Sequence, residues 1–394
     1  MPSKNYLLNK MVTEPRRFSD FDFIELVNKK GKEAVTFDDL RNNVRRIYDM
    51  NESSLLTASD AMQGGLGKLN LRKQKRRREN FFDRIRDGRR TKKYKTIVAE
   101  GDSWFCFPFY VKDINDWLID DDRINLYSIA AAGDWVTNII YEGKYVEELS
   151  LIEPEVFLIS GGGNDICGSN RLASMVSNNA NEKLEGDAFL ETAVAEAFDA
   201  FIWTLKTQYW ILLSSLKKAE KLKDLKVITQ GYDYIIPFPK IRRSSDLIQW
   251  AINKFSDTGN WLRTPLMLKG IMKIESHVTI MVHLIDEVNE MFKWLATYKE
   301  EGSDDFKFPN LYHVDCRHVA GGYKGWFDEI HLKSEKFEVV AKAYKHLIFE
   351  TQSAREMFDA NQKVVKAVWF NPDRNSPPTA EEKRLAMELT NKTR

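Results

Sequence analysis

Four short motifs carry the kinds of side chain and backbone group that hydrolyse esters. In chain order they are Gly101-Asp102-Ser103, Gly133, Gly162-Gly163-Asn164-Asp165 and Asp328-Glu329-Ile330-His331. Together they contain a hydroxyl nucleophile, donors for an oxyanion, a base and a carboxylate that can orient the base. The motifs therefore predict a reaction, acyl transfer through a serine, and leave the substrate open.

Ser103 is the candidate nucleophile, and it needs a base because a free serine hydroxyl is a weak nucleophile. His331 is the candidate base. Asp328, one helical turn earlier, can accept from the second ring nitrogen of His331 and stabilise the imidazolium. The tetrahedral intermediate then needs donors directed at its oxygen, which the backbone N–H groups of Ser103 and Gly133 and the amide of Asn164 can supply. This chemistry needs no metal and no organic cofactor.

The elements that must position these residues follow an alternating pattern from residue 96 onward. Strands are predicted at Ile97–Ala99, Ile124–Ala130, Val156–Ser160, Leu225–Thr229 and Leu311–Val314. Helices are predicted at Val111–Ile119, Asp134–Leu149, Phe189–Leu222, His277–Tyr298 and Glu335–Phe349. Such alternation builds a parallel α/β sheet with helices on both faces. Functional residues gather at the carboxyl ends of the strands in such sheets, and the four motifs fall there or in loops that can reach there.

The chain divides into three predicted parts: an N-terminal helical and basic region (1–95), a hydrolase domain (96–350) and a C-terminal helical tail (351–394). A glycine-containing break at 63–67 precedes the basic run, Arg72–Lys95, in which 13 of 24 residues are Lys or Arg. Residues 240–276, rich in Trp and Leu, exceed what the sheet needs. They can form a lid over the site, and they can equally be a plain helical insertion or an oligomer contact; they are called the candidate lid below.

The four motifs, in this order, resemble those of the SGNH hydrolases, the GDSL-type esterases and lipases. The resemblance extends from residue 96 to roughly residue 349 and implies a flavodoxin-like three-layer α/β/α sandwich of about five parallel strands. It also implies that Ser103, His331 and Asp328 form the catalytic triad. By the same resemblance, Gly133 and Asn164 complete the oxyanion hole with Ser103.

Two features depart from the family pattern. Trp104 takes the place of leucine after Ser103, a change that affects packing rather than chemistry. The interval from Asn164 to Asp328 is long for the family and implies inserted helices over or beside the site.

Each motif has a plainer interpretation when it is taken alone. The two glycine-containing motifs can be ordinary turns, and Asp328 can be a residue that caps a helix. Four motifs in the right order, at the ends of predicted elements, favour the catalytic interpretation. The aromatic residues after Ser103 either line an acyl pocket or pack in the core; they are Trp104, Phe105, Phe107, Phe109 and Tyr110.

The basic run Arg72–Lys95 has three interpretations. It can be a solvated helix that pairs with acidic patches of the same chain. It can bind an anionic membrane surface, with Phe81, Phe82 and Ile85 inserting at the interface. Finally, it can bind nucleic acid.

Composition bounds the remaining possibilities. The net charge is +1, and the three cysteines have no metal-ligand spacing. The chain begins without a signal-peptide pattern and has no apolar run long enough for a bilayer, so a cytoplasmic protein is expected. A lipase or phospholipase is the first expectation for the substrate class, followed by an esterase acting on small acylated molecules or carbohydrates. An effector whose basic N-terminal region binds nucleic acid or a protein partner is the rival. The oligomeric state stays open.

Overall fold

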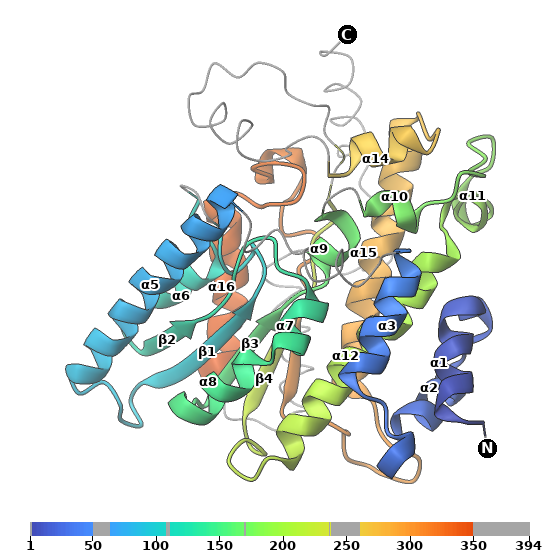
Figure 1. The fold of residues 1–394 in the computed structure, drawn as a ribbon. Helices are drawn as coiled ribbons and strands as arrows, with labels where there is room; N and C mark the ends of the chain where they lie inside the picture. Colours follow the sequence, from blue (N-terminus) through green and yellow to red (C-terminus); the bar gives the residue numbers. More distant parts are fainter. Residues whose placement is uncertain are drawn as a thin grey trace.

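Five strands form a single parallel sheet at the centre of the structure (Figure 1). The computed structural model describes residues 2–49, 64–107, 111–168, 171–235, 237 and 261–349. The strands are β1 (Lys95–Gly101), β2 (Ile124–Ser128), β3 (Val156–Ser160), β4 (Lys226–Gln230) and β5 (Leu311–Val314). Their spatial order is β2-β1-β3-β4-β5, and every neighbouring pair is parallel. This order is that of the flavodoxin-like sheets. The predicted α/β class is therefore confirmed.

The strands form where short apolar runs can be buried on both faces. Every residue of β2, β3 and β5 is buried, and in β1 and β4 only the first residue is partly exposed. A parallel sheet needs this pattern because the crossover helices cover both of its sides. All five strands predicted from the sequence lie within one to two residues of their observed bounds, since continuous apolar runs are a strong local signal.

Helices cover the two faces of the sheet in two groups. The first group is α6 (Ile114–Ile119), which packs against β2, and α16 (Ser334–Phe349), which packs against β5 and α6. The second group is α7 (Val136–Glu142), α8 (Lys144–Ile152), α12 (Glu196–Lys218) and α15 (Ile274–Thr297). Within it, α7 and α8 contact β1, and α15 contacts β4 and β5 (Figure 1). The molecule therefore has three layers.

The N-terminal helices dock on the second group. They are α1 (Lys4–Thr13), α2 (Asp20–Val27) and α3 (Phe37–Ile47), all of which contact α12. Capping boxes begin two of them: Ser19 with Asp22 at α2, and Thr36 with Asp39 at α3. The ring of Phe23 packs edge-on against Trp210 of α12. A capped amphipathic helix needs such a partner to bury its apolar face.

Three local expectations differ from the structure. The predicted helix at 134–149 is two helices, α7 and α8, because Gly143 between them adopts a left-handed conformation (φ +62°). The predicted helix at 189–222 is also two: α11 (Gly186–Ala193) and α12, separated where Val194 forms a bridge with Val176.

The third difference is the predicted glycine break at 63–67, which is wrong for residues 64–67. Helix α5 (Gly64–Arg86) begins there and runs along the edge strand β2 (Figure 1). Asn70, in its second turn, donates to Ala132 O and accepts from Ala132 N. These tertiary contacts offset the low helix propensity of glycine.

Four further short α-helices lie in the described part: α9 (Gly163–Cys167), α10 (Leu172–Met175), α11 and α14 (Arg263–Leu268). The described part also has three short 3-10 helices: η1 (Pro15–Arg17), η2 (Gly31–Glu33) and η5 (Tyr323–Gly325). The helices of the described ranges include none with the length and hydropathy to cross a bilayer. The predicted tail at 351–394, residues 240–260 of the candidate lid, and Phe109 and Tyr110 lie outside the described residues.

Candidate active site

The first motif turns sharply at the end of β1. Gly101 is required there, because a Cβ at this position would lie 2.3 Å from the carbonyl oxygen of Ser160 on the neighbouring strand β3. The strand can therefore pass close to β3 and then leave the sheet. Asp102 Oδ1 accepts from Trp104 N at 3.0 Å, which holds the turn that presents Ser103.

Ser103, His331 and Asp328 form a continuous chain of hydrogen bonds. Ser103 Oγ lies 2.7 Å from His331 Nε2, although the two residues are 228 positions apart. His331 Nδ1 lies 2.8 Å and 2.9 Å from the two carboxylate oxygens of Asp328. With the Nδ1 proton directed at Asp328, Nε2 is the ring nitrogen that can take the serine proton.

Backbone contacts fix the loop that carries the last motif. Asp328 Oδ1 accepts from the N–H groups of Ile330 at 2.9 Å and His331 at 2.8 Å, so the carboxylate closes its own turn. Trp104 Nε1 donates to Ile330 O at 3.0 Å and ties this loop to the first motif. The unusual tryptophan after Ser103 thus joins the two motifs.

Aromatic rings enclose the imidazole of His331. The ring of Phe107 lies with its centroid 4.5 Å away, and that of Trp261 lies 5.8 Å away, edge-on. Trp261 belongs to the described part of the candidate lid. These rings exclude water from one side of the Ser103–His331 pair, which strengthens the hydrogen bonds there.

The candidate oxyanion donors are only partly brought together. Asn164, in the first turn of α9, lines the same pocket as Ser103. Its Nδ2 donates one hydrogen to Asp134 O at 3.0 Å, and a primary amide carries a second hydrogen. Gly133, with φ +83°, precedes Asp134 in the loop after β2. In the described part of the chain, Gly133 does not line the pocket that Ser103 and Asn164 share.

Tyr232, which the sequence did not single out, links the first and third motifs. Its hydroxyl donates to Asp102 Oδ2 at 2.5 Å and accepts from Gly163 N–H at 3.0 Å. Burial raises the pKa of Asp102 above its ordinary value, and the bond from Tyr232 opposes that rise. Tyr232 follows β4 at the same edge of the sheet as the motifs, and this position is the signal that sequence reasoning missed.

Asp165, which follows Asn164 in the third motif, connects this motif to two other helices. Its Oδ2 accepts from Val136 N at 3.0 Å, at the beginning of α7, and its backbone oxygen accepts from the hydroxyl of Tyr48. Burial raises the pKa of Asp165 to about 6. The third motif is therefore held both by α7 and by the end of the N-terminal helix α3.

Glu329 stands between Asp328 and His331 in the sequence. Like Tyr232, it was not identified from the sequence as a functional residue. It is fully buried and accepts from the N–H groups of Trp261 at 3.0 Å and Arg263 at 3.3 Å, where α14 begins. Burial raises its pKa to about 8, although these N–H donors act in the opposite direction. Glu329 thus fastens the described part of the candidate lid to the loop of His331.

A pocket opens beside the candidate nucleophile, and its empty space of about 450 Å³ includes open solvent at the mouth. Asp102, Ser103, Gly163, Asn164 and Tyr232 form its polar end. The remaining lining residues are Trp104, Ile166, Cys167, Ile235, Met281, Leu284, Ile285 and Ile330.

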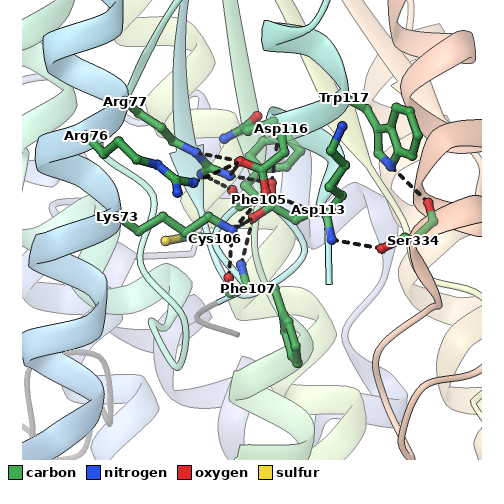
Figure 2. A network of polar contacts seen from close by, with 12 residues as sticks. Lys73, Arg76, Arg77, Phe105, Cys106, Phe107, Asp113, Asp116, Trp117 and Ser334 are labelled. Atoms are coloured by element: carbon green, nitrogen blue, oxygen red, sulfur yellow. Dashed lines mark hydrogen bonds and ion pairs between the residues drawn. The ribbon is translucent and has the colours of Figure 1, made fainter. Parts of the chain in front are cut away.

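Part of the basic run is buried and paired within the chain. Figure 2 shows Lys73 and Arg77 of α5 against Asp113 and Asp116, with N–O distances of 2.5–2.9 Å. Although burial opposes the change, the two cations lower the pKa of Asp116 to about 2. Lys73 and Arg77 thus pair with acidic residues of the same chain, as the first interpretation expects, but they are buried and not solvated.

Lys73 and Arg77 also bind backbone carbonyl groups in the segment that follows Ser103, the candidate nucleophile. Arg77 donates to Phe105 O at 2.6 Å, and Lys73 donates to Phe107 O at 2.7 Å. Since the ring of Phe107 packs on His331, α5 supports the site indirectly.

Other basic residues of the run are exposed: Arg72, Lys75, Arg76, Arg86, Arg90, Lys92 and Lys93. Their binding to an anionic membrane surface, a nucleic acid or a protein stays a prediction. Of the aromatic pair expected at an interface, Phe81 is buried and Phe82 is 47% exposed.

Within the described ranges, no cluster of three or more His, Cys, Asp or Glu side chains is arranged to hold a metal ion.

Comparisons with known proteins give distant structural likenesses. No family model matches the chain, and no curated protein matches it. Among solved structures, it is similar to a catalytic mutant of Axe2, an acetylxylan esterase from Geobacillus stearothermophilus, at 11% identity and a TM-score of 0.29. That match covers 65% of this chain and 95% of the other.

The chain is also similar to LAE5, an alpha/beta hydrolase enzyme from the metagenome of Lake Arreo, Spain. Here the identity is 14% and the TM-score 0.30, with 64% of this chain and 94% of the other covered. Because the identities and TM-scores are low, these likenesses carry no argument about the activity of this chain.

Proposed function

We propose that this protein is a serine esterase of the SGNH type, which hydrolyses carboxylic esters through an acyl-enzyme. The observation that carries the proposal is the unbroken hydrogen-bonded chain from Ser103 Oγ through the His331 ring to the Asp328 carboxylate. A nucleophile, a base within reach and a third group that orients the base are the signature of an activated serine.

Acylation begins when Ser103 Oγ attacks the carbonyl carbon and its proton passes to His331 Nε2. The carbonyl oxygen becomes an oxyanion, held by the backbone N–H group of Ser103 and by the amide hydrogen of Asn164 that is not bonded to Asp134 O. The N–H group of Gly133 is the third expected donor, although Gly133 does not line the pocket in the described part of the chain. As the intermediate collapses, the C–O bond to the alcohol breaks and His331 Nε2 gives its proton to the departing oxygen. An alcohol leaves, and the acyl group stays on Ser103.

Deacylation repeats these steps with water as the nucleophile. His331 Nε2 takes a proton from water, whose oxygen attacks the acyl carbon, and then returns the proton to Ser103 Oγ as the carboxylic acid departs. Asp328 holds the imidazole in the required tautomer throughout and stabilises its positive charge. The enzyme ends in its starting state.

Hydrolysis of a panel of p-nitrophenyl esters and phospholipids tests this proposal. Wild-type protein should hydrolyse at least one of these esters, and Ser103→Ala should lose on the order of 10⁴-fold or more of that rate. Ser215→Ala, which changes an exposed serine on α12, is the matched control and should keep full activity. Equal rates in Ser103→Ala and wild type, or no hydrolysis of any ester by wild type, would contradict the proposal.

A further inference from the structure

Away from its polar end, the pocket beside Ser103 is lined by apolar side chains. Met281, Leu284 and Ile285 line it from successive turns of α15, and Ile166 with Cys167 line it from α9. None of these five side chains carries a charge. Next to the ester carbonyl, this apolar surface favours binding of an apolar part of the substrate over a hydrated polar part.

Apart from Ser103 and Asn164, the polar side chains that line the pocket already form hydrogen bonds within the protein. Asp102 and Tyr232 bond to each other, and Tyr232 also accepts from Gly163. This leaves the Ser103 hydroxyl and the second amide hydrogen of Asn164 to meet the ester. Among the described lining residues, no side chain is therefore placed to recognise hydroxyl or charged groups farther along the substrate.

The position of His331 indicates which half of the ester enters the pocket. His331 does not line it within the described part of the chain, whereas Ser103 and Asn164 do. The leaving alcohol must take its proton from His331 Nε2, so it departs on the imidazole side, where Phe107 and Trp261 lie. The acyl group, on the other side of the carbonyl carbon, extends toward α15.

We propose that the pocket formed by α9 and α15 is an acyl-binding site, which makes the enzyme selective for esters of aliphatic carboxylic acids longer than acetic acid. This inference rests on the serine esterase activity proposed above and adds its substrate class. Each methylene that enters the pocket leaves water and contacts apolar side chains, so it favours the transition state of the longer ester.

A chain-length series of p-nitrophenyl esters tests the acyl site, from acetate through butanoate and octanoate to dodecanoate. The value of kcat/KM should rise by about fourfold for each methylene buried, and fall once the chain outgrows the pocket. A maximum at acetate would overturn the inference.

A variant at the pocket wall sharpens the test. Leu284→Trp narrows the pocket, so the ratio of kcat/KM for octanoate to that for acetate should fall by about tenfold or more. The control Glu275→Trp places the same side chain at an exposed position of the same helix and should leave the ratio unchanged. If Leu284→Trp does not fold, Met281→Ala is the second variant: it lengthens the pocket and should move the maximum to longer chains.

Labelling with a fluorophosphonate distinguishes failure of the acyl-binding site from failure of the serine esterase activity. If Ser103 is labelled and acetate is the best substrate in wild type and Leu284→Trp alike, the acyl site is wrong and the serine esterase stands. If Ser103 is not labelled and no ester is hydrolysed, the proposed function fails and the acyl site fails with it.

Discussion

The hydroxyl of Tyr232 donates a hydrogen bond to Oδ2 of Asp102 at 2.5 Å, across 130 positions of sequence. Asp102 immediately precedes the candidate nucleophile, and Gly163, whose N–H binds the same hydroxyl, immediately precedes Asn164. One oxygen atom thus connects the turn that presents the candidate nucleophile with the helix that presents a candidate oxyanion donor. We propose that Tyr232 is a positioning residue that acts on the reaction through Asp102.

Tyr232→Phe should lower kcat by about 10- to 100-fold with little change in KM. The ring and its edge-on contact with Trp104, at 5.2 Å, are kept, while Asp102 loses a donor inside the protein. Steady-state kinetics at a temperature where both proteins are folded give the answer. Tyr234→Phe is the matched control, because its hydroxyl binds Asp286 instead. A rise in KM with kcat unchanged would assign Tyr232 to substrate binding and not to positioning.

Asp328→Asn should lower kcat on the order of 10³- to 10⁴-fold. An amide at this position can donate to His331 Nδ1 and so favours the tautomer in which Nε2 carries the proton and cannot accept another. Rates of the single variants and of Asp328→Asn combined with Ser103→Ala measure the effect. Residues that act as a unit are not additive, so the double variant should be no slower than Ser103→Ala. Independent, multiplying losses would argue against a shared pathway.

Glu329 should make the protein less stable as the pH rises. Its pKa in the folded protein is about 8, raised by burial from an ordinary value of 4.5. Between these values the folded state keeps a proton that the unfolded state releases. The stabilisation is therefore complete below 4.5 and is lost as the pH rises through about 8.

Glu329→Gln carries a neutral amide of the same shape, so it should lose less thermal stability than wild type between about pH 6 and about pH 9. Values of Tm at the two pH values provide the measurement. Glu275→Gln, at an exposed position, should follow wild type. An equal drop in Tm for Glu329→Gln and wild type would show that Glu329 does not hold the extra proton.

Arg77→Met should destabilise the fold by about 3–5 kcal/mol, because it leaves Asp113 and Asp116 with less compensation for their buried charge. Arg77 is 2% exposed, whereas Lys75 in the same run has a side chain that is 78% exposed. Lys75→Met should therefore change the free energy of unfolding by no more than about 0.5 kcal/mol. Urea unfolding of the two variants compares them directly. Similar losses in both would mean that the pairing with α6 contributes little.

The sheet and the main candidate residues were predictable because their signals are local. The strands are continuous apolar runs, and the motifs of Ser103, Asn164 and His331 follow them at glycine-rich turns or near the end of the domain. The topology of a parallel sheet then brings the carboxyl ends of distant strands to one edge.

The supporting residues were not predictable because their roles depend on which segments meet. Tyr232 matters through Asp102, and Glu329 matters through Trp261, 68 positions away. Arg77 has the sequence context of a solvated helix, yet it is buried against α6. The glycines at 64–67 show the same limit in reverse, since tertiary contacts keep a helix where local propensity indicates a break.

Covalent labelling shows whether Ser103 is an activated nucleophile. Incubation with a fluorophosphonate, followed by mass spectrometry of the intact protein and its peptides, should show one adduct, located on Ser103. Labelling should be abolished in Ser103→Ala and greatly slowed in His331→Ala, because the hydroxyl reacts only when a base takes its proton. An adduct on another residue, or labelling that persists in Ser103→Ala, would show that Ser103 is not the nucleophile.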